Sequence, residues 1–109
     1  NIYPVEIETV LYSMADVVEA AVVGIPHEKW GEVPKAFLVL RPGAVLNAEE
    51  VIEYCKARLA GYKVPKIVEF HTTLPHSAAG KILKRDLNEE KRLNQSHMKE
   101  VMVKNGEKS

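Results

Sequence analysis

The stretch VVEAAVVGIPHEKWGEVPKAFLVLRPG, residues 17–43, decides the fold. It contains two short apolar runs, residues 17–25 and 36–40, and the first is rich in β-branched side chains. Each run is closed by a turn signal, Pro26 in the first case and an Arg-Pro-Gly triplet in the second, so both are predicted to be buried strands. The connection is too short for a crossover, which predicts an antiparallel pair around a loop at residues 26–32.

A helix is expected on each side of this strand pair. Before it, Pro4 suits a first helical turn because its missing N–H is not needed there, and apolar residues recur at helical spacing up to Met14. After it, Asn47 followed three residues later by Glu50 has the spacing of a capping box, which marks a helix start. Gly61 is expected to end that second helix.

The rest of the chain completes a small sheet. A third strand is predicted at residues 66–71, followed by a loop at residues 74–81, and Asp86 marks where a further helix would begin. The order is therefore αββαβ. It predicts a small two-layer α+β domain, in which helices pack on a three-stranded sheet.

Composition limits the class of protein. With 109 residues, 46% of them hydrophobic and 28% charged, the chain has the balance of one globular domain rather than of a disordered segment. Lys plus Arg and Asp plus Glu both number 15, which argues against a nucleic-acid binder. A single cysteine excludes an internal disulfide framework, and no apolar stretch is long enough to cross a bilayer. We therefore expect a cytoplasmic protein without a transmembrane segment.

The zero net charge hides a basic segment. Residues 70–85 contain no acidic residue, but they carry five basic or titratable side chains: His71, His76, Lys81, Lys84 and Arg85. Such a segment is a candidate anion site if nothing nearby neutralises its cations, and a solvated basic loop otherwise. The charge pattern alone leaves both interpretations open.

No metal site or nucleophile is expected. The histidines and the cysteine lack the close paired spacing of metal ligands, and Cys55 falls on the apolar stripe of the second helix, where it is predicted to be a buried small hydrophobe. Gly80 and Lys81 do not form a P-loop, because Pro75 replaces the earlier glycine and no Ser or Thr follows the lysine. Instead, the lysine lies in LPHSAAGKIL, residues 74–83, where small residues would let it approach a phosphate on another surface.

Four segments in register resemble the C-terminal domain of the adenylate-forming (AMP-binding) enzymes, which include acyl-CoA synthetases, luciferases and the adenylation domains of peptide synthetases. They are NIYPVEIE at residues 1–8, VGIPHEKWGE at 23–32, YKVPK at 62–66 and LPHSAAGKIL at 74–83. Their order and spacing match as far as about Leu87, so the resemblance implies that residues 1–87 are this domain. Residues 88–109 would be a C-terminal extension, helical or partly disordered.

The resemblance is greatest to the acyl-CoA synthetases and implies their reaction. Such enzymes join a carboxylate to ATP, giving acyl-AMP and pyrophosphate, and CoA then displaces AMP. We expect the chain to be a piece of a longer protein, whose large N-terminal domain would hold most of the ATP, Mg²⁺ and carboxylic acid site. The small domain would rotate between the two half-reactions. By this resemblance Lys81 is the catalytic lysine of adenylation, Gly80 belongs to the same binding loop, and the isolated chain is inactive.

The resemblance also implies part of a CoA site. Trp30, Tyr62, Lys63 and Lys66 match positions that help to hold CoA in related ligases, with the tyrosine stacking on adenine and the lysines meeting phosphates. Val64 departs from this pattern, since some relatives carry Arg there. From the residues alone, the tryptophan could equally be a half-buried anchor of its loop and the tyrosine a helix-cap contact.

Two alternatives remain open. An adenylation domain could load the thiol of a carrier protein instead of CoA. A stand-alone α+β regulatory or interaction module would also suit the αββαβ order. A nucleotide pocket with basic residues favours CoA, whereas a carrier protein needs a docking surface.

Overall fold

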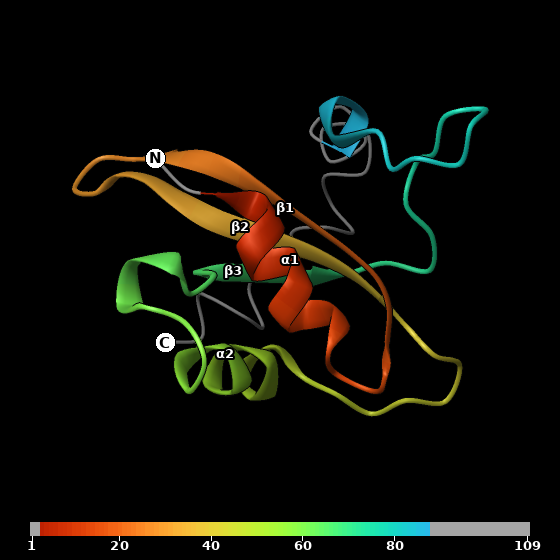
Figure 1. Cartoon of the computed structure of the whole chain (residues 1–109), viewed down its shortest axis with the longest axis horizontal. Helices are drawn as coiled ribbons and strands as arrows, with labels where there is room; N and C mark the ends of the chain where they lie inside the picture. The colour runs from red at the N-terminus through yellow and green to blue at the C-terminus, as the bar shows by residue number, and fades with distance from the viewer. Residues whose placement is uncertain (1–2, 88–109) are drawn as a thin grey trace.

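Two helices and three strands follow one another in the expected order. The computed structural model describes residues 3–87, so the predicted extension at residues 88–109 lies outside the described residues. The elements are α1 (Pro4–Tyr12), β1 (Val17–His27), β2 (Gly31–Leu40), α2 (Ala48–Lys56), the short 3₁₀ helix η1 (Gly61–Lys63) and β3 (Ile67–Phe70) (Figure 1). The αββαβ order and the α+β class are thereby confirmed. No helix within the described part of the chain is long and apolar enough to span a membrane.

The sheet has the strand order β1-β2-β3. β1 and β2 form the expected antiparallel hairpin, which pairs from Val17–Leu40 to His27–Gly31 with a register shift between Val17 and Glu19. β3 lies parallel to β2 along residues 35–38. A parallel pair requires a long crossover, and α2 and η1 lie in the segment that supplies it.

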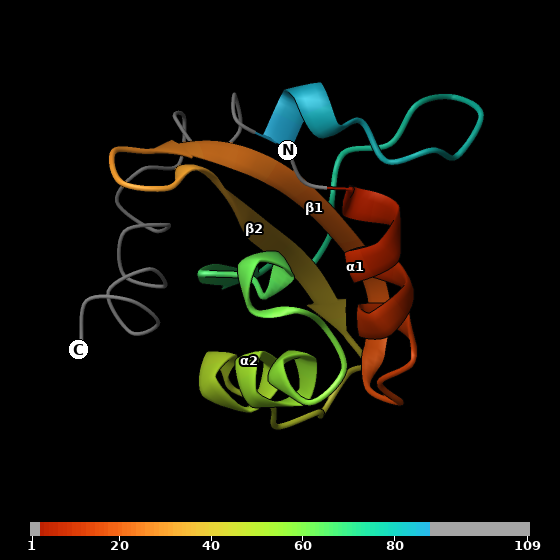
Figure 2. The ribbon, with the colours of Figure 1, turned by 60° about the vertical axis from the view of Figure 1, so that its left-hand side comes forward.

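Both faces of the sheet are buried, which explains why the strands appear in the sequence as nearly continuous apolar runs. One face packs against α1 and α2 in a core that includes Ile7, Leu11, Val22, Leu38, Val51 and Cys55. The opposite face packs against residues 74–87 through Ala21, Phe37, Leu74 and Leu87. Figure 2 shows this segment above the curved hairpin and α2 below it. Neighbouring residues of β2 therefore serve opposite cores.

The hairpin is longer than predicted. β1 continues to His27 and β2 begins at Gly31, so only residues 28–30 form the turn. The loop predicted at residues 26–32 is wrong at both ends. Proline and charged residues near this turn suggested irregular structure, but the long pairing of the two strands outweighs these local signals.

Pro34 lies inside the central strand, a position that proline normally avoids because it has no N–H to donate. On the β3 side, however, Pro34 needs only its carbonyl, which accepts the Lys66 N–H at 3.0 Å. The β2–β3 ladder begins one residue later, with Lys35 opposite Ile67. β3 itself, Ile67–Phe70, agrees with the predicted range of 66–71 to within one residue at each end.

α1 ends at Tyr12 rather than at Met14 as predicted. At this end the backbone hydrogen bonds tighten to span three residues, with the Ser13 N–H donating to the Val10 carbonyl at 3.1 Å and the Met14 N–H to the Leu11 carbonyl at 3.0 Å. The Ser13 hydroxyl also donates to the Val10 carbonyl, at 2.6 Å. It also lies 2.6 Å from the Tyr54 hydroxyl on α2, which ties the end of one helix to the other.

α2 begins with the predicted capping box. The Glu50 N–H donates to the Asn47 side chain at 2.9 Å, and the Asn47 N–H donates to the Glu50 carboxylate at 3.0 Å. The predicted end at Gly61 is wrong, because α2 stops at Lys56 and Gly61 instead opens η1. Gly61 is not among the described glycines with positive φ, so it lacks the conformation of a helix-ending glycine.

Candidate functional site

Lys81 lies on a compact loop, residues 74–83, which is organised around Ser77. The Ser77 hydroxyl oxygen accepts the N–H groups of Ala79 and Lys81, each at 3.2 Å. The Ser77 N–H donates to the Lys81 carbonyl at 2.8 Å, and the Gly80 N–H donates to the Ser77 carbonyl at 2.9 Å. The loop predicted over residues 74–81 is therefore an ordered turn with its own hydrogen bonds.

Gly80 gives this loop its turn. Its φ is +89°, a conformation that L side chains rarely adopt. A Cβ built at this position would meet no other atom within 4 Å. The glycine is thus favoured by the backbone conformation and not by crowding.

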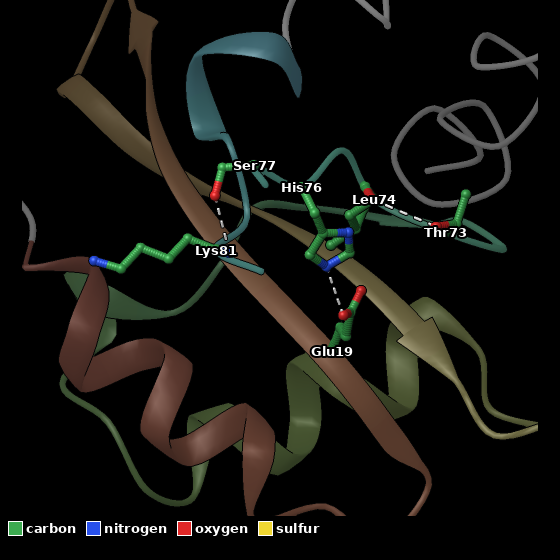
Figure 3. A network of polar contacts seen from close by, with 6 residues as sticks. All are labelled: Glu19, Thr73, Leu74, His76, Ser77 and Lys81. Atoms are coloured by element: carbon green, nitrogen blue, oxygen red, sulfur yellow. Dashed lines mark hydrogen bonds and ion pairs between the residues drawn. The ribbon is translucent and has the colours of Figure 1, made fainter. Parts of the chain in front are cut away.

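The loop is fixed to the body of the domain on both sides of the lysine. Before it, Nε2 of His76 lies 2.7 Å from Oε2 of Glu19 on β1 (Figure 3). After it, Nζ of Lys84 lies 2.7 Å from Oε2 of Glu8 on α1. The same Glu8 oxygen accepts the backbone N–H of Val22 at 2.8 Å.

Residues 84–87 form a helical turn, so the helix predicted near Asp86 begins two residues earlier.

These contacts change the interpretation of the basic segment at residues 70–85. Four of its five basic or titratable side chains contact carboxylates, in the pairs His71–Glu69, His76–Glu19, Lys84–Glu8 and Arg85–Asp86. Lys81 is exposed, and within residues 3–87 no carboxylate forms an ion pair with its Nζ. Its side chain extends away from the other labelled residues (Figure 3). Of the five side chains, Lys81 is the one without a carboxylate partner among the described residues.

Trp30 occupies the turn of the β1–β2 hairpin. Nδ1 of His27 accepts the backbone N–H groups of Lys29 and Trp30, each at 3.1 Å, which closes the turn. Trp30 is 60% exposed, and Nζ of Lys29 lies 5.3 Å from its ring centroid. This exposure argues against the half-buried anchor and leaves an aromatic surface with a cation beside it.

The other candidate CoA residues lie on and after η1. Tyr62 is 66% exposed, and Lys66 is also exposed. Lys63 is already engaged, since its Nζ lies 2.6 Å from Oε1 of Glu6 on α1. This hydrogen bond raises the pKa of Lys63 above its ordinary value. Tyr62 and Lys66 are therefore more accessible to a ligand than Lys63, whose ammonium group is bound to Glu6.

The structure does not bring all the candidates into one site. The turn that carries Trp30 and the η1 segment that carries Tyr62 lie toward one side of the domain, away from the 74–83 loop with Lys81 (Figures 1 and 2). We refer to the turn and the η1 region, with Trp30, Tyr62 and Lys66, as the aromatic surface.

The remaining histidines and the cysteine have structural surroundings. His71 and His76 contact different glutamates, and no group of three metal-ligating side chains occurs among the described residues. Cys55 is fully buried, and burial raises its pKa to about 11. The prediction of a buried small hydrophobe is confirmed at this position.

Sequence reasoning missed the acidic partners of the 74–87 segment and a buried ion pair. Glu19 is 57 residues from His76, and no local pattern relates two such distant positions. Nζ of Lys35 lies 2.7 Å from Oε2 of Glu69, and the two side chains are 1% and 0% exposed. The sequence signal for this ion pair was the position of its two charged residues, since Lys35 directly precedes one apolar run and Glu69 lies inside the third predicted strand.

Residues 6–81 match the family described as the AMP-binding enzyme C-terminal domain. The chain is 51% identical over 90 residues to a long-chain-fatty-acid–CoA ligase of Yersinia pestis. It is 47% identical over 87 residues to a feruloyl-CoA synthase of an Amycolatopsis species. These alignments cover 83% and 80% of this chain but only 16% and 18% of the two relatives.

A solved structure agrees with these sequence matches. It is the o-succinylbenzoate coenzyme A synthetase MenE from Bacillus subtilis in complex with ATP and magnesium ion. The TM-score is 0.72 and the sequence identity 43%, over 81% of this chain and 18% of that one. The chain therefore spans a small part of the ligases that it matches. It belongs to the family of AMP-binding enzyme C-terminal domains and is homologous to the acyl-CoA ligases.

Proposed function

We propose that residues 1–87 act as the mobile C-terminal domain of an AMP-forming acyl-CoA ligase and supply the lysine of its adenylation step. The observation that carries this proposal is the state of Lys81. It is exposed on an ordered loop, and among the described residues it forms no ion pair with a carboxylate, whereas its basic neighbours do. An exposed ammonium group on an ordered loop can bind an anion that another domain brings to it.

In the first half-reaction, a carboxylate oxygen of the acid attacks the α-phosphorus of ATP. The bond from that phosphorus to the bridging oxygen breaks, and pyrophosphate leaves with the electron pair. Negative charge therefore grows on the leaving group as the reaction proceeds. The Lys81 ammonium stabilises this growing charge more than it stabilises bound ATP, which lowers the barrier. In this proposal ATP and Mg²⁺ are bound mainly by the N-terminal domain.

In the second half-reaction, the thiol of CoA attacks the acyl carbonyl carbon and AMP leaves. In this proposal Lys81 has no role in this step, because the domain has rotated and carried the lysine away from the active site. We assign the aromatic surface to it instead, with Trp30 and Tyr62 stacking against CoA and Lys66 meeting a phosphate. The exposure of these rings, 60% and 66%, supports this assignment.

The test uses the full-length enzyme that contains this domain. Exchange of labelled pyrophosphate into ATP, measured with a panel of carboxylic acids, detects the first half-reaction. We expect exchange that depends on one class of acid, followed by AMP release when CoA is added. Absence of exchange with every acid would contradict the proposal. AMP release with a carrier-protein thiol but not with CoA would favour the alternative acceptor.

A further inference from the structure

The 74–83 loop has two polar anchors of different kinds. On its C-terminal side, Glu8 holds Lys84 at 2.7 Å and also accepts the Val22 N–H at 2.8 Å. Because that N–H belongs to the backbone of β1, the carboxylate keeps one fixed partner even when the lysine moves. The C-terminal anchor is therefore built into the sheet.

On the N-terminal side, the anchor is the Glu19–His76 pair. Nε2 of His76 lies 2.7 Å from Oε2 of Glu19, the distance of a strong hydrogen bond to a carboxylate. His76 also forms a single antiparallel bridge with Ile82, the residue directly after Lys81. Two backbone hydrogen bonds form this bridge, Ser77 N–H to the Lys81 carbonyl at 2.8 Å and Leu83 N–H to the Pro75 carbonyl at 2.9 Å, so the backbone around His76 is tied to the backbone that carries the lysine.

We expect the Glu19–His76 pair to contribute little to the folding stability of the domain. Its side chains are 28% and 31% exposed, and partly exposed ion pairs add little to folding stability. The segment is held instead by Leu74 and Leu87, which are 2% and 1% exposed in the second core. The Glu19–His76 pair can instead determine the position of the 74–83 loop relative to β1.

We propose that Glu19 and His76 are positioning residues for the adenylation lysine. Glu19 fixes His76, His76 fixes Ile82 through the bridge, and the loop then presents Lys81 in one geometry. This inference rests on the proposed role of Lys81. Glu19 on β1 would thereby determine how well Lys81 reaches the phosphates of ATP, although Glu19 acts on the lysine only through His76 and the loop.

The test compares Glu19→Ala, Glu19→Gln and His76→Ala in the full-length enzyme. A misplaced catalytic group costs about 10- to 100-fold in rate, so we expect Glu19→Ala and His76→Ala to lower pyrophosphate exchange by such a factor. Glu19→Gln should lose less, because an amide oxygen still accepts the His76 N–H. Thioester formation from preformed acyl-AMP should be unchanged in all three variants. Glu53→Ala, which removes an exposed ion pair on α2, is the matched control and should change neither rate.

A second arm combines Glu19→Ala with Lys81→Ala. If Glu19 acts through the lysine, its removal has no further effect once the lysine is gone, so the double variant should exchange as slowly as Lys81→Ala alone. A residue that merely stabilises the fold would lower the residual exchange again and would lower thioester formation too. Either of those results would overturn the inference.

The failures of the two proposals are distinguishable. Normal exchange in Lys81→Ala would overturn the proposed function itself. Impaired exchange in Lys81→Ala together with normal exchange in both Glu19→Ala and His76→Ala would leave the proposed function intact and overturn the positioning role.

Discussion

One backbone angle shapes the loop that carries Lys81. Gly80 has φ +89°, and no atom lies within 4 Å of a Cβ built there. Gly80→Ala should therefore lower the free energy of unfolding by about 1 kcal/mol, through backbone strain alone. Gly61→Ala is the matched control, because Gly61 has the same open surroundings without positive φ. Urea denaturation should find Gly61→Ala unchanged or more stable, and equal stabilities for both variants would contradict the explanation.

The aromatic surface offers a second test at the level of single residues. Base–aromatic stacking is worth about 1–3 kcal/mol, so Trp30→Ala and Tyr62→Ala in the full-length enzyme should each raise the apparent KM for CoA by about fivefold or more. Pyrophosphate exchange should stay normal. Tyr12→Ala is the control, since Tyr12 is a 47% exposed tyrosine on α1 outside this surface. An unchanged KM for CoA in both variants would make these residues structural.

At the scale of elements, the sequence predicts best what local signals specify. The capping box at Asn47 and the antiparallel hairpin rest on spacings of a few residues, and both are confirmed. The predicted helix ends were wrong, since α1 ends in hydrogen bonds that span three residues at Ser13 and Met14, and α2 stops at Lys56, five residues before Gly61. The limit of local signals also applies to the site, where Lys81 and its loop could be predicted but the Glu19 anchor could not. The roles of these residues stay predictions.

The buried Lys35–Glu69 pair joins β2 to β3 and allows a test of how the sheet is held together. Removing one partner of a buried ion pair leaves an uncompensated charge, so Glu69→Ala should cost about 3–5 kcal/mol of folding free energy. Replacing both partners by apolar residues, Lys35→Met with Glu69→Leu, should recover most of this loss. Chemical denaturation measures both variants. A double variant no more stable than Glu69→Ala would contradict this account, and Glu53→Ala at an exposed pair should change little.

At the scale of the whole molecule, the candidate residues lie on separate segments of the domain. The cationic loop with Lys81 and the aromatic surface with Trp30 lie on different parts of one small sheet domain (Figure 1). In the proposed function, each of these segments serves a different half-reaction at one active site. A rotation between the half-reactions would present them in turn, which is the motion that the proposed function requires.

The most direct test of this account measures the two half-reactions separately in Lys81→Ala of the full-length enzyme. Loss of a transition-state electrostatic contact costs about 10²- to 10³-fold, so pyrophosphate exchange should fall by that factor. Preformed acyl-AMP and CoA should still give thioester at the normal rate. Arg85→Ala, four residues away and 85% exposed in its side chain, should leave both rates unchanged. Normal exchange in Lys81→Ala, or an equal loss of both half-reactions in a folded protein, would contradict the account.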